Sequence, residues 1–265
     1  MTGALVLREG DARPPLLLLH GFTGGPASWR AVAERLVPAR CALAVALPGH
    51  DPARPLPLRG GFLDAVRALG DELGQARAES ACGGGPWHLA GYSMGARLGL
   101  ALLLERPELF CGASLVGLHP GLPTEAERRS RRVEDCAWIE ILRREGVDAF
   151  ADAWESRSLF ASQASAPDEA RAAQRAIRRT HDAEQLARAL ETLGLGAMPD
   201  LLPSLPSIQV PVTVVAGSED TKFAALAGRV LPGLAFGNLV TIDGAGHNPL
   251  LERPDAVAAI LSRSA

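Results

Sequence analysis

The sequence predicts an α/β fold, a mostly parallel central sheet flanked by helices, with a helical insertion. Short apolar runs alternate with helical patterns over the first 120 residues, and the alternation returns after residue 206. Between them the chain is charged and rich in arginine, without a strand pattern. Because alternating strands and helices build parallel sheets, we expect a core from residues 1–120 and 206–265 and a helical cap from residues 121–205.

Six apolar runs are the expected strands of this sheet. They are short, nearly continuous in apolar residues and bounded by turn residues, as buried parallel strands are. The segment 96–104, which follows the third run, is apolar nearly all round and predicts a buried helix. In chain order the expected strands are residues 15–19, 42–47, 87–90, 112–118, 208–216 and 238–243.

The turn between the third strand and its helix carries the pattern G-x-S-x-G, centred on Ser93. In a sharp strand-to-helix turn the serine hydroxyl is exposed above the sheet, and the glycines Gly91 and Gly95 allow the two elements to pack closely. The helix N-terminus also offers free N–H groups to a developing anion. The pattern therefore predicts the nucleophile elbow of an α/β-hydrolase fold. The alternative is a glycine-rich turn whose serine only caps the helix.

An elbow of this kind requires an acid and then a histidine later in the chain. Asp220 follows the fifth strand, and His247 lies in a glycine-rich loop after the sixth. Both positions are at carboxyl ends of strands, where such sheets carry their functional loops. Taken singly, Asp220 could be a turn acid and His247 a loop histidine. Their order and placement together predict a Ser93–His247–Asp220 triad.

A second loop is expected to complete an oxyanion hole. The first strand ends in His20-Gly21-Phe22-Thr23-Gly24, a loop of the type that supplies a backbone N–H opposite the one after the serine. We assign the two donors to the N–H groups of Phe22 and Met94. His20 and His50 are expected to order loops rather than to take part in chemistry.

Composition excludes several other classes of protein. The chain has 265 residues and a net charge of −3, so it lacks the basic surface of a nucleic-acid-binding protein. It has no apolar stretch of membrane-spanning length, no leader-like N-terminus and no metal or dinucleotide motif. We expect a cytoplasmic enzyme acting on a small molecule, as a monomer or small homo-oligomer, without membrane or nucleic-acid partners. The scattered cysteines are expected to be buried free thiols; they are Cys41, Cys82, Cys111 and Cys136.

Arg97 lies four residues after Ser93, one turn along the elbow helix. In a simple esterase an apolar residue would fill this place. An arginine here could hold an anionic group beside the serine, and a charge-assisted pair of this kind contributes roughly 1.5–3 kcal/mol. The alternative is a salt bridge to a nearby acid.

The segment Gly91–Arg97 resembles the G-Y-S-[ML]-G-[GA]-R signature of the 2-succinyl-6-hydroxy-2,4-cyclohexadiene-1-carboxylate synthases, the menaquinone-pathway family of α/β-hydrolases. The elbow alone indicates only the α/β-hydrolase superfamily. The resemblance to this one family depends on Arg97, on the D-x-K-F pattern that begins at Asp220 and on the spacing of the cap arginines. The resemblance covers nearly the whole chain. It includes the loops at residues 20–22, 47–50, 119–122, 217–223 and 244–248 and the cap residues Arg131, Asp135, Trp138, Trp154 and Phe160.

The resemblance implies elimination of pyruvate from 2-succinyl-5-enolpyruvyl-6-hydroxy-3-cyclohexene-1-carboxylate, with Ser93 acting as base on a ring proton and with no metal or organic cofactor. This substrate is a polycarboxylate with three carboxylates, which Arg97, Arg131 and Arg178 are expected to bind. Tyr92, Trp154 and Phe160 are expected to line the pocket. The alternatives are an ester or thioester hydrolase acting through an acyl-serine and a catalytically inactive binding module.

The sequence departs from the family pattern at three places. Met198 stands where a glutamine is typical, and Asp51 where glycine is usual. The third arginine falls in the run Arg175, Arg178, Arg179; counting back from Leu186 favours Arg178, whereas counting forward from Phe160 favours Arg175. We prefer Arg178.

Overall fold

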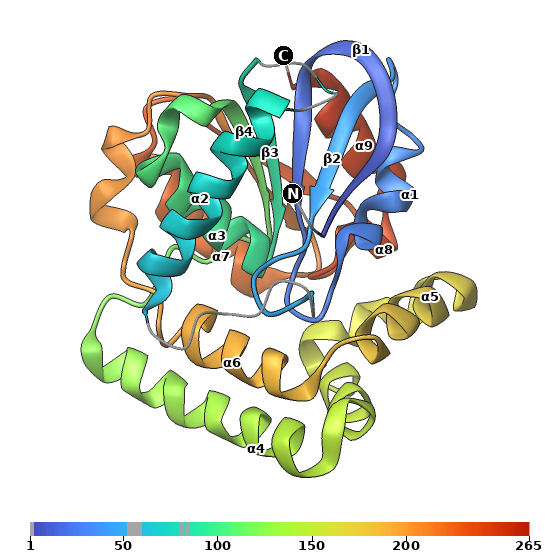
Figure 1. Ribbon diagram of the computed structural model, residues 1–265, viewed down its shortest axis with the longest axis vertical. Coiled ribbons are helices and arrows are strands. Elements are labelled where there is room, and N and C mark those ends of the chain that lie inside the picture. The colour runs from blue at the N-terminus through green and yellow to red at the C-terminus, as the bar shows by residue number, and fades with distance from the viewer. Residues whose placement is uncertain (1–2, 52–59, 80–81, 83–84, 265) are drawn as a thin grey trace.

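The computed structural model describes residues 3–51, 60–79, 82 and 85–264. They form a six-stranded sheet in the order β2-β1-β3-β4-β5-β6, in which the strands run parallel except for residues 4–12 of β1, whose pairing with β2 runs in the opposite direction (Figure 1). The predicted α/β architecture is therefore confirmed. The strands are β1 Ala4–Leu19, β2 Arg40–Val45, β3 Trp87–Tyr92, β4 Phe110–Val116, β5 Val212–Gly217 and β6 Gly237–Ile242.

Helices cover both faces of the sheet. In β1, Leu17 and Leu19 pack in the same core as residues of α2 and α3, whereas Leu16 and Leu18 pack in the core shared with α1 and α9. This division follows from the alternation of side chains along a strand. The helices of the core are α1 Arg30–Ala33, α2 Phe62–Glu79, α3 Met94–Glu105, α7 Thr221–Val230, α8 Pro249–Glu252 and α9 Pro254–Arg263, with short 3₁₀ turns η1 Pro26–Trp29, η2 Pro107–Leu109, η4 Leu202–Ser207 and η5 Leu231–Gly233.

The inserted segment forms a helical layer across one edge of the sheet (Figure 1). It contains α4 Glu125–Glu155, the 3₁₀ turn η3 Ser158–Ser165, α5 Asp168–Arg179 and α6 Ala183–Leu193, with no strand among its residues. Thr124 caps α4, since its hydroxyl accepts from the Glu127 N–H and the Glu127 carboxylate accepts from the Thr124 N–H. Gly146 kinks α4 because its φ of 85° is outside the helical region. The kink turns the last part of α4 toward the sheet.

The observed strand bounds differ from the predicted ones by at most two residues, except at the starts of β1 and β5, where the difference is larger. β1 begins at Ala4 rather than Pro15, because residues 4–12 also pair with β2, in the direction opposite to that of residues 16–19. This part of β1 is only partly buried, so it shows no apolar run by which it could be recognised. β5 begins at Val212 rather than Ile208. Pro211 has no N–H to donate to a neighbouring strand, and residues 208–210 form an irregular link between the end of η4 at Ser207 and the strand.

The prediction that all four cysteines are buried free thiols is wrong. Cys41 in β2 and Cys82 after α2 form a disulfide, with their Cα atoms 5.4 Å apart. Both residues pack in the core between β2 and α2, which brings together two positions 41 residues apart in the sequence. Cys111 is only half-buried and Cys136 is exposed. The spacing of Cys41 and Cys82 in the sequence could not reveal the disulfide, because only the fold brings these two residues together.

In the part of the chain that the structure describes, no helix has the length and apolar character needed to cross a membrane.

Candidate active site

Ser93 occupies a strained turn between β3 and α3. Its φ of 51° and ψ of −107° cost of order 1–3 kcal/mol for a residue other than glycine. A Cβ atom on Gly95 would lie 2.2 Å from the Leu19 carbonyl oxygen, and one on Gly91 would lie 2.5 Å from the Gly95 oxygen. Only glycines therefore allow β3 and α3 to meet so sharply. The turn leaves the Ser93 side chain facing a cavity.

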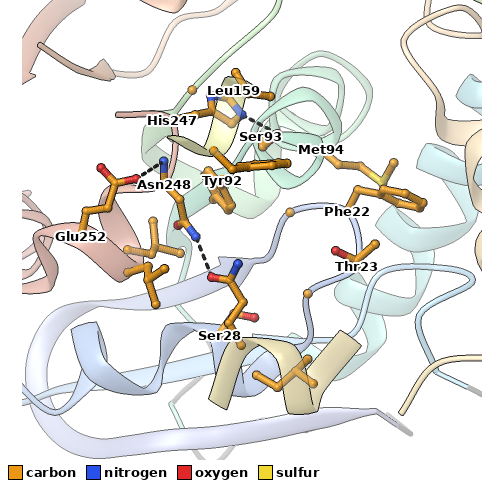
Figure 2. A pocket seen from close by; sticks show the side chains of 18 of the residues that line it. Phe22, Thr23, Ser28, Tyr92, Ser93, Met94, Leu159, His247, Asn248 and Glu252 are labelled. Carbon is orange, nitrogen blue, oxygen red and sulfur yellow. Dashed lines mark hydrogen bonds between the residues drawn. The ribbon is translucent and has the colours of Figure 1, made fainter. Parts of the chain in front are cut away.

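Ser93, His247 and Asp220 lie in one hydrogen-bonded line (Figure 2 shows the contact of Ser93 with His247). The distance from His247 Nε2 to Ser93 Oγ is 3.1 Å, and that from His247 Nδ1 to Asp220 Oδ2 is 2.7 Å. Asp220 also caps α7 by accepting from the Phe223 N–H at 3.4 Å. His247 and Asp220 are buried, so a proton taken by His247 would be held close to the carboxylate. The arrangement can remove a proton from the Ser93 hydroxyl.

Glu252 holds the loop that carries His247, a role that the sequence analysis did not assign to it. Its carboxylate accepts hydrogen bonds from the N–H groups of Gly246 and Asn248, the residues on either side of His247, and from the Ser162 hydroxyl at 3.1 Å (Figure 2). Glu252 is 6% exposed. Its spacing of five residues after His247 is the one sequence feature that could have suggested this role.

Two neutral histidines fix the loop between β1 and η1. His20 Nδ1 donates to the Gly21 carbonyl, and Nε2 accepts from the Leu47 N–H at 3.0 Å. His50 Nε2 accepts from the Thr23 N–H at 3.1 Å. Burial lowers the pKa of His20 to about 3 and that of His50 well below its ordinary value. Since neither ring contacts Ser93 by hydrogen bond, both act on loop conformation, as we expected.

The two residues predicted to supply oxyanion donors line the cavity that Ser93 faces. Phe22 follows the end of β1 and Met94 is the first residue of α3, and both line the same cavity as Ser93 (Figure 2). The Met94 N–H is at the helix N-terminus, where no earlier turn supplies an acceptor.

The cavity above Ser93 has a volume of about 950 Å³ and lies between the sheet edge and the helical layer. Tyr92, Trp154 and Phe160, the three aromatic residues expected in a pocket, all line it. Tyr92 also lies beside the catalytic histidine candidate, with 5.6 Å between its ring centroid and that of His247. Burial raises the pKa of the Tyr92 hydroxyl, so it stays protonated.

Arg97 faces this cavity without an acidic partner among the described residues. Its Nη1 donates to the Leu193 carbonyl oxygen at 2.8 Å, and its side chain is nearly covered. Burial, followed by repulsion from Arg131, lowers the pKa of Arg97 to about 9. No acidic side chain among the described residues forms an ion pair with Arg97, so the salt bridge considered as its alternative role is not formed. The guanidinium remains charged at neutral pH, and its charge is poorly compensated.

Arg131, on α4, lines the same cavity. Its Nε donates to Asp135 Oδ1 at 2.9 Å, and the exposed Glu134 is 4.0 Å away. Asp135 is buried, and burial raises the pKa of its carboxyl group despite the nearby arginines.

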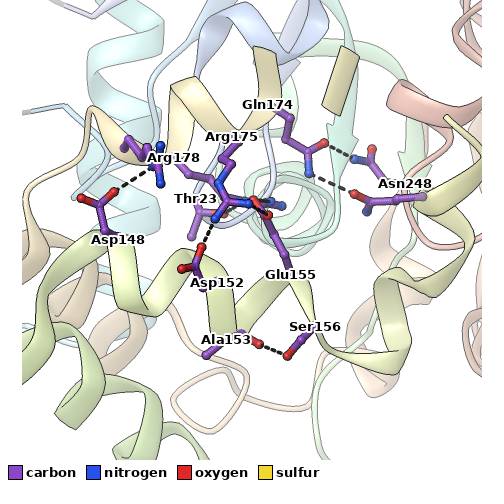
Figure 3. A network of polar contacts seen from close by, with 12 residues as sticks. Thr23, Asp148, Asp152, Ala153, Glu155, Ser156, Gln174, Arg175, Arg178 and Asn248 are labelled. Atoms are coloured by element: carbon purple, nitrogen blue, oxygen red, sulfur yellow. Dashed lines mark hydrogen bonds and ion pairs between the residues drawn. The ribbon is translucent and has the colours of Figure 1, made fainter. Parts of the chain in front are cut away.

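Of the three arginines considered on α5, only Arg178 lines the cavity. Its Nη1 is 2.6 Å from Glu155 Oε1, and its Nε donates to Thr23 Oγ1 at 3.1 Å. Arg175 pairs with Asp152 and Glu155 at the outer side of the helix, and Arg179 pairs with Asp148. Figure 3 shows Arg175 and Arg178 converging on the carboxylates that follow the kink in α4.

The departures from the family pattern have different surroundings. Met198 is fully buried, and its sulfur lies 4.0 Å from Arg97 Nη1, where an amide would offer a stronger acceptor. Asp51 is half-buried at the end of the described segment 3–51. Arg157, to which the sequence analysis assigned no role, also lines the cavity. No cluster of three or more potential metal ligands occurs among the described residues.

Comparison with known proteins agrees with this geometry. A model of the alpha/beta hydrolase family matches residues 16–260, so the chain is a member of that class. The 2-succinyl-6-hydroxy-2,4-cyclohexadiene-1-carboxylate synthases of Salmonella agona and Salmonella schwarzengrund are each 34% identical over 251 residues, which is 94% of this chain and 93% of each relative. Within the alpha/beta hydrolases, the chain belongs to the family of these synthases.

Solved structures show the same relationship. MenH from S. aureus superimposes with a TM-score of 0.89 at 26% identity, covering 98% of this chain and 97% of that one. A thermophilic esterase from Thermogutta terrifontis reaches a TM-score of 0.76 at 22% identity, with 97% and 91% of the two chains covered. The second likeness shows the fold alone.

Proposed function

We propose that this enzyme eliminates pyruvate from 2-succinyl-5-enolpyruvyl-6-hydroxy-3-cyclohexene-1-carboxylate to give 2-succinyl-6-hydroxy-2,4-cyclohexadiene-1-carboxylate. The observation that carries the proposal is the poorly compensated guanidinium of Arg97 in the cavity of Ser93. A neutral ester would gain nothing from a buried positive charge one helical turn from the serine. The names of the curated relatives support the same reaction.

In this proposal Ser93 is a base, and His247 is the group that activates it. His247 takes the Ser93 proton through Nε2, while Asp220 holds Nδ1–H and so fixes the ring orientation. The Ser93 oxygen then removes the ring proton next to the succinyl carbonyl. The electron pair of that C–H bond forms the C2=C3 double bond, the C3=C4 π pair shifts to C4=C5, and the bond from C5 to the enolpyruvyl oxygen breaks. The departing enolate takes the proton that His247 removed from Ser93 and becomes pyruvate. Water is not a reactant.

The negative charge of the transition state spreads onto the succinyl carbonyl oxygen. The N–H groups of Phe22 and Met94 would hold this oxygen, and each such donor contributes about 3–4 kcal/mol in comparable sites. Arg97, Arg131 and Arg178 would bind the carboxylates, while Tyr92, Trp154 and Phe160 would enclose the ring. Residues 121–205 form the cap over this site in the proposal, and residues 1–120 and 206–265 form the core. We also propose a cytoplasmic location and a monomer or small homo-oligomer.

The experiment compares two reactions of the purified enzyme and of Arg97→Ala. The unaltered enzyme should release pyruvate from the enolpyruvyl substrate. Arg97→Ala should lower kcat/KM for pyruvate release by about 30- to 1000-fold, equivalent to roughly 2–4 kcal/mol. Hydrolysis of p-nitrophenyl acetate, a neutral ester, should change little. Absence of pyruvate release, or an equal loss of both activities, would make a carboxylic-ester hydrolase the better assignment.

A further inference from the structure

Arg157 lies between α4 and η3 with its guanidinium over two indole rings. Its Cζ atom is 4.4 Å from the ring centroid of Trp154 and 5.4 Å from that of Trp138. The residue is half-buried and lines the cavity that contains Ser93. Stacking on two aromatic faces holds the guanidinium in place and leaves its N–H edge available to a planar acceptor.

The surrounding charges do not neutralise Arg157. No carboxylate among the described residues forms an ion pair with it, whereas Arg143, Arg175 and Arg179 of the same helical layer each form at least one. Burial lowers the pKa of Arg157, and Arg131 lowers it further, because like charges are close. A half-buried cation without a counterion lowers the stability of the folded protein, and an anionic ligand that binds beside it removes this cost.

Three guanidiniums, those of Arg97, Arg131 and Arg157, share one buried carboxylate. Asp135 interacts electrostatically with Arg97 and Arg157 and is hydrogen-bonded to Arg131. The other acid nearby, Glu134, is mostly exposed and 4.0 Å from Arg131. About two positive charges therefore remain at this end of the cavity. Arg178 differs, because Glu155 compensates it directly.

We propose that Arg157 is a substrate-binding residue that acts with Arg97 and Arg131 to hold two carboxylates of the substrate at one end of the cavity. The inference rests on the proposed function, since it assigns a fourth arginine to the same polycarboxylate. It also accounts for Met198, whose thioether cannot donate a hydrogen bond to a carboxylate beside Arg97. In this proposal Arg157 supplies N–H donors to that carboxylate. The identity of the residue at 157 then determines how strongly the enzyme prefers a dianionic end group.

The test uses two variants and a matched control. Arg157→Gln removes the charge, and Arg157→Met removes it while keeping a long side chain against Trp154. Arg143→Gln removes an arginine of α4 that pairs with Glu184 and Glu191 on the surface. Calorimetry measures the Kd of 2-succinylbenzoate, a stable dicarboxylate with a succinyl group and a ring carboxylate, and of 3-benzoylpropanoate, which lacks the ring carboxylate. KM and kcat for pyruvate release and the rate of p-nitrophenyl acetate hydrolysis are measured in parallel.

In both Arg157 variants the Kd of 2-succinylbenzoate and the KM for pyruvate release should rise about tenfold or more. The Kd of 3-benzoylpropanoate should rise less. The control should stay within about twofold of the parent for all ligands, and ester hydrolysis should be nearly unchanged in every variant. Dicarboxylate affinity equal to that of the control would overturn the proposal, as would a parallel loss of ester hydrolysis, which indicates a structural role. If the parent binds the dicarboxylate through Arg157 but releases no pyruvate, the proposed reaction fails while the binding role stands.

Discussion

Replacing Arg97 by methionine should stabilise the free enzyme and disable the reaction. In the folded protein burial lowers the pKa of Arg97 from its ordinary value to about 9, so the penalty for its charge grows as pH falls toward 9 and is complete at pH 7. That difference corresponds to about 5 kcal/mol. Replacement leaves the Leu193 carbonyl without its donor, which costs roughly 1.5–3 kcal/mol. Removal of the guanidinium should therefore raise the free energy of unfolding by about 2–3.5 kcal/mol at pH 7.

Urea denaturation followed by tryptophan fluorescence measures the stability, and a lactate dehydrogenase assay measures pyruvate release. Pyruvate release should fall about 30- to 1000-fold in the same variant. Arg143→Met provides the control, because its exposed ion pairs contribute little to stability. A less stable Arg97→Met protein that retains full pyruvate release would refute the reasoning, since Arg97 would then be a structural residue with an adequate partner.

Three further outcomes are expected. Ser93→Ala should lower pyruvate release by at least about 10³-fold, while its unfolding free energy changes by less than about 1 kcal/mol in urea, because the hydroxyl faces the cavity. Glu252→Gln should reduce kcat about 10- to 100-fold with little change in KM, because one amide oxygen cannot replace the carboxylate that accepts from both sides of the His247 loop; an unchanged kcat in steady-state assays would argue against it. The pKa of His20 is about 3 when folded and 6.5 when unfolded, so the unfolded state binds more protons between these values. The free energy of unfolding should then fall by about 1.4 kcal/mol per pH unit as pH drops from 6.5 toward 3, and His20→Gln should remove this contribution from the pH dependence measured by denaturation.

The sequence was sufficient for the features that depend on local pattern and chain order. The strand-turn-helix around Ser93 has a short strand, two obligatory glycines and an apolar helix, and each is visible in the sequence. Asp220 and His247 each follow a strand, and their order in the chain predicted that their loops meet beside Ser93 at the carboxyl ends of the strands. Choosing Arg178 among three arginines also agrees with the structure, in which it alone of the three faces the cavity.

Features that depend on three-dimensional proximity were not predictable. The Cys41–Cys82 disulfide joins residues 41 positions apart with no motif between them. Arg157 could not be separated from the other cap arginines, because only the kink at Gly146 and the turn into η3 bring it over Trp138 and Trp154. The first part of β1 was missed because an exposed edge strand needs no apolar pattern.

The most direct test of the central claim is the stoichiometry of the two products formed by the purified enzyme. Elimination creates one conjugated ring diene for each pyruvate released, so absorbance of the diene and enzymatic quantification of pyruvate can be followed in one reaction. Our account predicts equal amounts of diene and pyruvate, formed at the same rate, with both losing at least about 10³-fold in Ser93→Ala. Pyruvate without diene, or hydrolysis of esters with neither product, would contradict it.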